Sequence, residues 1–249
     1  MKVLSLGVAA LCLCAQVWAQ TFEPDHYVAY KVKAVGLASH DISVRDKFID
    51  WTEFRLSIPY MLLNPTIKLH NGNNCDINNK ELHYAAYKLE KRNAITVNQP
   101  IQVSNQFGQF EINEMTLHHI LVPTRSEEVI SVADRAKVLD ATHYLCYDIP
   151  ETPIEAEQGT ISDEFRIRDF VVTAAKTLCT PAAKVHGNNL YDINDDYDTN
   201  HLMCFSLEHK HLLKFRTLAN QFGNKSVMIT KDSELCVPST VTTTGDQQP

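Results

Sequence analysis

Glycine is scarce in this chain, and no long apolar run follows its first twenty residues. There are 8 glycines among 249 residues. This low content, with moderate proline and ordinary hydrophobicity, indicates a folded rather than a disordered protein. No segment beyond residue 20 is apolar enough to cross a membrane. The 23 lysines and arginines form no cluster and are outnumbered by 30 aspartates and glutamates. Nucleic acid is therefore not expected as a partner, because neutralising its phosphates requires grouped basic residues.

The common catalytic motifs are also missing. The sequence has no Gly-x-Ser-x-Gly turn, no His-Glu-x-x-His helix and no glycine-rich phosphate loop. Paired carboxylates such as Glu127-Glu128 fall in connecting segments, where solvated side chains are the ordinary outcome. We therefore expect no catalytic residue and no cofactor, although a triad that is assembled only in space leaves no such motif.

Residues 1–20 have the pattern of a secretory signal peptide. Lys2 supplies the positive start, Val3 to Cys14 form a short apolar core, and small residues surround Trp18. The core is too short for a membrane-spanning helix, which needs about 20 apolar residues. The sequence predicts a secreted protein, extracellular or periplasmic, with no membrane span.

Four segments of the remaining chain follow one pattern, repeated about every 58 residues. Each begins with a histidine-led strand rich in aromatic residues, continues to a polar-polar-Phe corner, and closes on a strand that ends in proline. The opening histidines are His26, His83, His143 and His201, the corners begin at Asp46, Asn105, Asp163 and Asn220, and the closing prolines are Pro65, Pro123, Pro181 and Pro238. The spacing from histidine to proline is about 40 residues in every copy, which indicates a tandem repeat.

The residue pattern within each copy predicts strands. Side chains alternate in the opening segments, for example from His26 to Val32, as they do in half-buried strands. The Asp or Asn of each corner can accept a hydrogen bond from a following backbone amide, which predicts an Asx turn. With about four short strands in each copy, the predicted fold is all-β, with four tandem antiparallel repeats. We expect these to pair into two sandwich-like modules, repeats 1–2 and 3–4; a four-bladed, propeller-like ring is the alternative.

The expected boundaries follow the repeats. They are a signal peptide over 1–20, repeat 1 over 21–71, connectors with repeats 2, 3 and 4 over 72–125, 126–186 and 187–240, and a disordered tail over 241–249. Between Ser126 and Leu139, apolar residues are interleaved with charges, and this segment is predicted to form a short helix.

Four of the cysteines beyond the signal peptide lie at equivalent repeat positions. The predicted disulfides are Cys146–Cys179 and Cys204–Cys236. The same two positions hold Ala29 with Leu63 in repeat 1 and Ala86 with Leu121 in repeat 2. Both members of the pair have therefore changed together, which favours bonded cysteines over free thiols. Each disulfide would contribute roughly 3–4 kcal/mol by closing a loop, against ~1.5–3 kcal/mol from the buried leucine of an Ala–Leu pair. Disulfides also indicate an oxidising compartment.

Cys75 has no counterpart in the other repeats and lies in the polar connector over residues 71–76. One interpretation is a free or partly buried thiol. The other is an intermolecular disulfide that links two copies into a dimer, because an odd cysteine in a secreted protein has no internal partner.

Histidines are the first candidates for metal ligands. The four opening histidines head the same strand in every copy, so we interpret them as framework residues. Two closely spaced pairs are unrepeated, His118-His119 and His209-Lys210-His211. Adjacent residues on a strand point to opposite faces, whereas alternate residues share one. A zinc or copper site would need further ligands, which the sequence does not place.

The segment 192–200 is the densest acidic stretch. Its oxygen-bearing residues alternate like the start of a calcium loop, at Asp192, Asn194, Asp196 and Asp198. Tyr197 stands where such a loop requires glycine. A weak calcium site and a solvated connector are both compatible with this pattern.

The repeated residues resemble an uncharacterised family of secreted, mostly bacterial tandem-repeat proteins. The shared pattern is His-Leu/Tyr-x-Cys-Tyr/Phe, then Asn/Asp-Gln-Phe-Gly, then Leu-Cys-x-Pro. Repeat 4 matches it best, through His201-Leu202-Met203-Cys204-Phe205, Asn220-Gln221-Phe222-Gly223 and Leu235-Cys236-Val237-Pro238. Repeats 1 and 2 depart by lacking both cysteines. The resemblance implies export and a non-catalytic β-repeat module, and it carries over no active-site residue.

We expect a secreted or cell-surface protein with a non-catalytic binding or structural role, because several equivalent units suit multivalent contact. The partner would be an unidentified surface ligand, a protein or a carbohydrate; Trp51 is the candidate aromatic for carbohydrate. The alternative is a secreted hydrolase or metal-dependent enzyme. It requires unrepeated polar residues to converge in one pocket, namely His118, His119, His209, His211 and Asp195.

Overall fold

Fifteen strands and no helix make up the part of the chain that the structure describes. The computed structural model describes residues 25–36, 39–128, 141–193 and 200–243; the predicted signal peptide lies outside them. The strands are β1 (His26–Ala34), β2 (His40–Arg45), β3 (Thr52–His70), β4 (Asn73–Cys75), β5 (His83–Glu90), β6 (Thr96–Val97), β7 (Ile101–Asn105), β8 (Gly108–Ile112), β9 (Met115–Glu127), β10 (His143–Ser162), β11 (Ile167–His186), β12 (Asn189–Tyr191), β13 (His201–Leu207), β14 (His211–Asn220) and β15 (Gly223–Thr243). The prediction of an all-β fold is confirmed.

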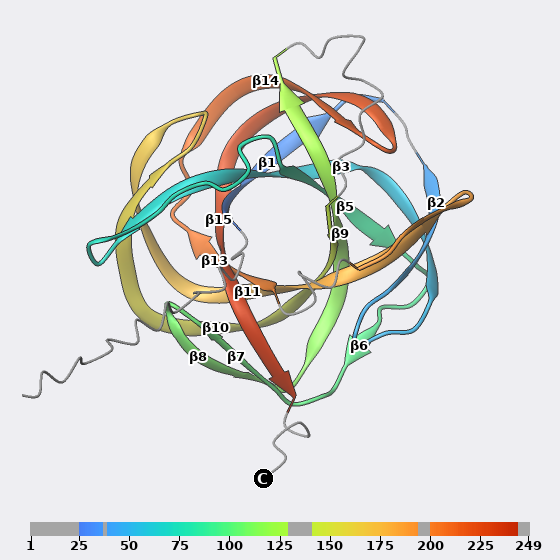
Figure 1. Ribbon diagram of the computed structural model, residues 1–249, viewed down its shortest axis with the longest axis horizontal. Helices are drawn as coiled ribbons and strands as arrows, with labels where there is room; N and C mark the ends of the chain where they lie inside the picture. Colours follow the sequence, from blue (N-terminus) through green and yellow to red (C-terminus); the bar gives the residue numbers. More distant parts are fainter. Residues whose placement is uncertain (1–24, 37–38, 129–140, 194–199, 244–249) are drawn as a thin grey trace, which may run out of the picture.

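Eight of these strands close into a ring. Their order is β1, β3, β5, β9, β10, β11, β13 and β15; each pairs antiparallel with the next, and β15 pairs back with β1. Figure 1 shows the ribbons circling a common centre. The histidine-led segments begin β1, β5, β10 and β13, and the closing prolines lie in β3, β9, β11 and β15. All fifteen strands belong to one sheet, so a division into two sandwich-like modules is not confirmed.

The predicted Asx turns are present at all four corners. The backbone amide of each corner phenylalanine donates a hydrogen bond to the Asp or Asn side chain two residues earlier. The pairs are Phe48 to Asp46 (2.8 Å), Phe107 to Asn105 (2.9 Å), Phe165 to Asp163 (2.8 Å) and Phe222 to Asn220 (2.9 Å). This bond uses one side-chain oxygen and leaves the second polar atom of each Asp or Asn available for other contacts.

Each corner lies at the tip of a hairpin that reaches a distant part of the chain. The tip of β10 pairs with the end of β3, and β2 pairs in return with β11. In the same way β14 pairs with β9, and the end of β15 pairs with β7. The first and third segments are thus joined reciprocally, and so are the second and fourth.

The ring separates two apolar clusters. The smaller one includes Tyr27, Tyr84 and Tyr144, whose rings meet edge to face at centroid distances of 5.4 and 5.5 Å. A closing strand lies between each two of their strands, so these side chains can meet only on the concave face. This cluster therefore fills the inside of the ring. The larger cluster consists of side chains that point outward from the ring of strands, such as Tyr30 and Tyr147, and of hairpin residues that cover them.

The expected short helix and the expected disordered tail lie partly outside the described residues. Ser126 and Glu127, at the start of the expected helix, end strand β9, and residues 129–140 are not described. Strand β15 continues into the expected tail as far as Thr243, which lies opposite Ile101 of β7; residues 244–249 are not described.

Candidate ligand-binding site

Each closing strand contains a β-bulge at the same distance before its closing proline. In β9, His119 lies opposite Cys146 and Leu117 lies opposite Tyr147, so His118 has no Cα partner. The same shift in register occurs in the other closing strands. The residues without a Cα partner there are Tyr60 in β3, Lys176 in β11 and Ser233 in β15. A bulge bends the strand and redirects its side chains.

The bulges bring a set of mostly polar side chains to the inside of the ring, beside the inner apolar cluster. We call this set the bulge layer. It consists of the bulge residues and their successors, Tyr60-Met61, His118-His119, Lys176-Thr177 and Ser233-Glu234, with Lys31, Lys88 and Asp148 from the opening strands.

The ring of Tyr60 is surrounded by side chains from three other strands. Its centroid lies 5.9 Å from the ring centroid of His118 and 5.7 Å from that of His119. The ammonium groups of Lys31 and Lys88 lie 5.4 and 5.3 Å from the same centroid. At these distances a cation is attracted by the quadrupole of the aromatic ring. Tyr60 thus connects β1, β5 and β9 across the inside of the ring.

Both residues of the His118-His119 pair belong to the layer, although adjacent histidines on an unbroken strand would point to opposite faces. Their ring centroids are 5.3 Å apart, because the bulge interrupts the alternation. His118 Nδ1 lies 3.2 Å from Asp148 Oδ1. Burial acts to raise the pKa of Asp148, but its hydrogen bond with His118 and the nearby histidine charges lower it on balance. Burial, followed by the charge of His118, lowers the pKa of His119 to about 3.

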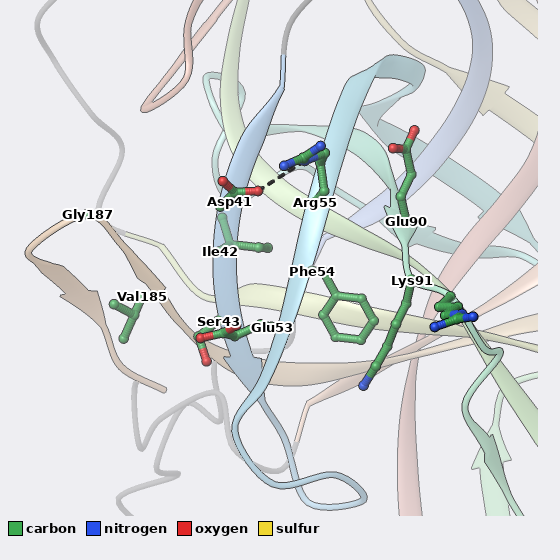
Figure 2. A pocket seen from close by; sticks show the side chains of 11 residues that line it. Asp41, Ile42, Ser43, Glu53, Phe54, Arg55, Glu90, Lys91, Val185 and Gly187 are labelled. Carbon is green, nitrogen blue, oxygen red and sulfur yellow. Dashed lines mark hydrogen bonds and ion pairs between the residues drawn. The ribbon is translucent and has the colours of Figure 1, made fainter.

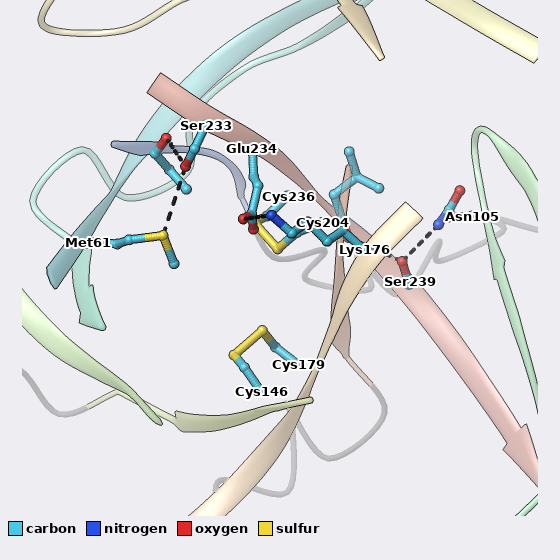
Figure 3. The surroundings of a disulfide bond; sticks show 12 residues. Met61, Asn105, Cys146, Lys176, Cys179, Cys204, Ser233, Glu234, Cys236 and Ser239 are labelled. Atoms are coloured by element: carbon cyan, nitrogen blue, oxygen red, sulfur yellow. Dashed lines mark hydrogen bonds and ion pairs between the residues drawn. A yellow bond between two sulfur atoms is a disulfide. The ribbon is translucent and has the colours of Figure 1, made fainter. Parts of the chain in front are cut away.

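Glu234 and Lys176 form an ion pair in the layer (Figure 3). Lys176 Nζ lies 3.8 Å from Glu234 Oε1. Burial raises the pKa of Glu234, and the charges of Lys176 and Lys31 oppose that shift. The adjacent bulge residue, Ser233, donates a hydrogen bond to the carbonyl oxygen of Ala29 at 3.2 Å.

Positive charge predominates in and around the bulge layer. Burial lowers the pKa of Lys31, and Glu234 opposes this shift. The charges of Lys176, Lys231 and Lys88 then lower the pKa of Lys31 further. Three further lysines therefore lie within electrostatic reach of Lys31, and the layer itself contributes two carboxylates. Since the whole chain has a formal net charge of −7, this is a basic location in an acidic protein.

The layer has an exposed rim and a buried floor. The side chains of His118 and Asp148 are 35% and 51% exposed, whereas those of His119 and Glu234 are almost fully covered. A ring nitrogen of His119 lies within 4.8 Å of both sulfur atoms of Cys146–Cys179. A carboxylate oxygen of Glu234 lies within 4.8 Å of both sulfur atoms of Cys204–Cys236. Because a disulfide offers no thiolate, neither group is a metal-ligand set in the oxidised protein.

Both predicted disulfides are confirmed, and they join directly opposite residues of the ring (Figure 3). Cys146–Cys179 and Cys204–Cys236 have Cα–Cα distances of 4.0 and 3.9 Å. The Ala–Leu pairs occupy matching places, with Ala29 opposite Leu63 and Ala86 opposite Leu121. Two apolar pairs in the N-terminal half and two covalent pairs in the C-terminal half therefore occupy equivalent positions around the inside of the ring.

The four opening histidines are buried, and each interacts with the middle corner residue of the next segment. Three interactions are direct: His26 with Gln106 (3.0 Å), His143 with Gln221 (2.9 Å) and His83 with Glu164 (3.3 Å). For His201, burial and then the charge of Lys47 lower the pKa to about 3. The cycle closes from the last segment to the first, which supports the interpretation of these histidines as framework residues.

The second closely spaced pair, His209 and His211, has different surroundings. His209 Nδ1 lies 2.9 Å from the carbonyl oxygen of Asp232, and His211 is exposed at the start of β14. Asp195 lies outside the described residues. Of the five residues that the enzyme alternative requires, the structure places His118 and His119 together.

The calcium candidates are described only at Asp192. Its Oδ1 accepts a hydrogen bond from the Ile193 amide at 2.9 Å and lies 3.6 Å from Arg45 Nη2. Residues 194, 196 and 198 lie outside the described chain. Trp51 is 43% exposed, and the Arg45 guanidinium lies 5.1 Å from its ring.

Cys75 is half-buried and is not disulfide-bonded within the described chain. It ends the short strand β4, where it lies opposite Lys68. An intermolecular disulfide through Cys75 stays a prediction.

A surface hollow of about 700 Å³ lies outside the ring, beside β2 and β3 (Figure 2). Arg55 and Asp41 in its lining are exposed and already form an ion pair at 3.2 Å. The Lys91 ammonium lies 5.2 Å from the ring of Phe54. Because these charged groups have partners and face solvent, the hollow is a weaker candidate site than the bulge layer.

Sequence reasoning singled out His118 and His119 but missed the rest of the bulge layer. The signal was present: the four similarly patterned segments agree at the histidines, corners and prolines but differ at the bulge positions, which read Tyr-Met, His-His, Lys-Thr and Ser-Glu. The contrast between constant framework positions and variable bulge positions is the pattern that would have identified the layer.

No protein-family model, curated protein or solved structure matches the chain. Within the described ranges, no helix has the length and apolar character needed to span a bilayer.

Proposed function

We propose that this chain is an exported, non-catalytic binding protein. Four repeats build its ring, and the bulge layer holds its ligand. The two intramolecular disulfides support export, because such bonds persist in oxidising compartments. The leader-like segment over residues 1–20 supports it independently. On this proposal the ligand is a surface carbohydrate, a protein group or a small molecule outside the cell.

The fourfold repeat is supported by contacts that recur at equivalent positions. Every corner makes an Asx turn, every closing strand has a bulge, and every opening histidine faces the next corner. These contacts connect the ring to its hairpins, so we assign them a role in stabilising the fold.

The observation that carries the proposal is the contrast between this framework and the bulge layer. Framework side chains have mutual partners, whereas the layer combines aromatic, basic and acidic side chains that differ from copy to copy. A rigid ring holds them in place, which limits the entropy lost on binding. A few convergent polar groups beside apolar surface are typical of ligand sites.

The alternative of a secreted hydrolase or metal-dependent enzyme has one observation in its favour. His118 and Asp148 form a pair of the kind that orients a general base. Binding is the better-supported function because no activated nucleophile accompanies this pair among the described residues.

Backbone amide spectra of the oxidised mature chain test the proposal. They would be recorded with soluble glycans, peptides and small metabolites, with each probe assayed for conversion by mass spectrometry. We expect shift changes concentrated at residues 60–61, 118–119, 176–177 and 233–234, with no product formed. Turnover of a probe that is abolished by His118→Ala would favour the enzyme instead.

A further inference from the structure

We infer that the bulge layer binds the oxyanion of a small molecule: a carboxylate, phosphate or sulfate group held between Lys31 and Lys88 beside Tyr60. This inference rests on the proposed binding function and names the chemical class of its ligand.

Hydrogen-bond donors without an oxygen acceptor in the described chain gather around Tyr60. Lys31 Nζ donates to the thioether sulfur of Met61 at 3.2 Å, and a thioether sulfur is a weak acceptor. Lys88 Nζ faces the Tyr60 ring and has no carboxylate within ion-pair distance in the described chain. The Tyr60 hydroxyl likewise makes no hydrogen bond to any described residue. These groups can all donate to one oxygen-rich ligand.

A buried group points to the same conclusion. His119 is 3% exposed, and its Nδ1 has no hydrogen-bond partner in the described structure. A buried polar atom of this kind normally has a partner, which is a protein group, an ordered water or a ligand. The His119 ring packs against the Tyr60 ring, and the charges of Lys31 and Lys88 reach it, so this side chain lies in the same part of the bulge layer as the two lysines.

The charge of Glu234 reaches Lys31, but neither carboxylate of the layer lies within ion-pair distance of Lys31 or Lys88. Asp148 is hydrogen-bonded to His118, and Glu234 is within ion-pair distance of Lys176. Two lysines thus remain for a ligand, on strands β1 and β5 that flank Tyr60 of β3. Lysine ammonium groups bind oxyanions as point charges, without the fixed fork of arginine. This arrangement therefore accepts the three anion types and does not select one by its shape alone.

The test measures binding of sodium phosphate, sulfate and citrate to the full oxidised protein, with glucose as a neutral probe. Chloride keeps the ionic strength constant, because screening alone changes apparent affinity. Titration calorimetry gives the dissociation constants, and amide shifts give the location. At least one anion is expected to bind and to shift residues of the bulge layer, while glucose does not. The ranking of the three anions identifies the group that the natural ligand carries.

Lys31→Met and Lys88→Met are each expected to weaken anion binding on the order of 10-fold. Lys91→Met is the matched control, since it removes the same charge from the outer hollow and should leave affinity unchanged. Tyr60→Phe keeps the ring and removes only the hydroxyl, so it tests the site even if a lysine variant fails to fold; a several-fold loss is expected.

Anion affinity that is unchanged in the two lysine variants and in Tyr60→Phe overturns the inference. So does the absence of anion-induced shifts in the layer. Glucose binding at these residues without anion binding also overturns it but leaves the proposed binding function in place. That function fails separately, if the broader probe set is converted to products or shifts only residues outside the layer.

Discussion

The hydroxyl of Tyr30 donates a hydrogen bond of 2.6 Å to Asp163 Oδ2, across 133 positions of sequence. The reciprocal bond runs from Tyr147 to Asp46 Oδ2, at 2.8 Å. Each carboxylate also accepts backbone amides of its own corner through its other oxygen. One Asp side chain therefore fixes a local turn and anchors that hairpin to the opposite part of the ring.

Tyr30→Phe should destabilise the protein by ~1–3 kcal/mol. The substitution keeps the aromatic ring but removes the hydroxyl that donates to Asp163. This largely buried carboxylate is then left with one hydrogen bond fewer and little access to water that could replace it. Tyr87→Phe should cost less, about 1 kcal/mol, because its partner is the neutral amide of Asn220 at 3.0 Å. Urea unfolding of both variants checks the order. Equal destabilisation would show that charge on the corner residue is unimportant.

The Ala–Leu pairs provide a design for replacing a disulfide. The double variant Cys146→Ala with Cys179→Leu reproduces the pair at Ala29 and Leu63. It loses roughly 3–4 kcal/mol of loop closure and regains ~1.5–3 kcal/mol through burial of the leucine. We therefore expect a folded protein that is ~1–2 kcal/mol less stable, measured by urea unfolding without reductant.

The control for this replacement is the same pair changed to serines. Two buried hydroxyls recover little apolar burial, so the serine variant should lose clearly more stability than the Ala–Leu variant. If the two variants were equally unstable, the Ala–Leu pairs could not be substitutes for disulfides.

The protein should lose stability in mild acid because its framework histidines are buried. Burial lowers the pKa of His26 to about 3, and it holds the pKa of His143 well below the ordinary value of 6.5. Between about 6.5 and 3 the unfolded chain binds protons that the folded chain does not. The free energy of unfolding therefore decreases as the pH is lowered through this window, by up to ~1.4 kcal/mol per pH unit for each histidine. The raised pKa of Glu234 acts in the opposite direction.

His143→Gln isolates one of these contributions. It should reduce the slope of stability against pH between 6.5 and 4, while its difference from the parent protein stays constant above pH 7.5. Urea midpoints at pH 8, 6.5, 5 and 4 measure this. A slope identical to that of the parent would mean that His143 does not contribute to the acid sensitivity.

Lys184→Met should stabilise the protein at pH 7 by ~2–4 kcal/mol. Lys184 is fully buried, and its Nζ has no hydrogen-bond partner in the described structure; the Tyr191 and Phe222 ring centroids lie 4.3 and 4.7 Å away. Burial lowers its pKa from 10.5 to about 6. Between these values the unfolded chain holds the extra proton, so the parent protein gains stability as pH rises and the variant should not.

Urea unfolding at pH 7 and 9.5 measures both effects. Lys68→Met is the matched control, because Lys68 is also buried but donates a hydrogen bond to Gln106. Its pKa is lowered only to about 8, so its replacement should stabilise the protein less. Destabilisation by Lys184→Met would show that its contacts with the two rings outweigh the desolvation of the amine.

The features that were predictable depend on comparing equivalent positions or on local geometry. The Cys146–Cys179 bridge was predictable because the same two positions change together elsewhere in the chain. The Asx turns were predictable because the hydrogen bond that the Phe48 amide donates to Asp46 spans only two residues. Neither inference requires knowledge of how distant strands are arranged.

The bulge layer was not predictable in the same way. Simple alternation places His118 and His119 on opposite faces, and only the pairing of β9 with β10 shows that one residue is left out. Lys31, Tyr60 and Glu234 are far apart in sequence, and each looks like an ordinary strand residue by itself.

The amino-acid sequence by itself determined the all-β character, the corners and the covalent pairs, because strand alternation and turn chemistry act locally and the paired cysteine positions change together from one segment to the next. Tertiary structure alone decided that the strands close into one ring, that opposite hairpins anchor each other, and that bulge residues from four strands share its inside. Ring closure and strand register depend on the free energy of packing the whole chain, which no single segment encodes.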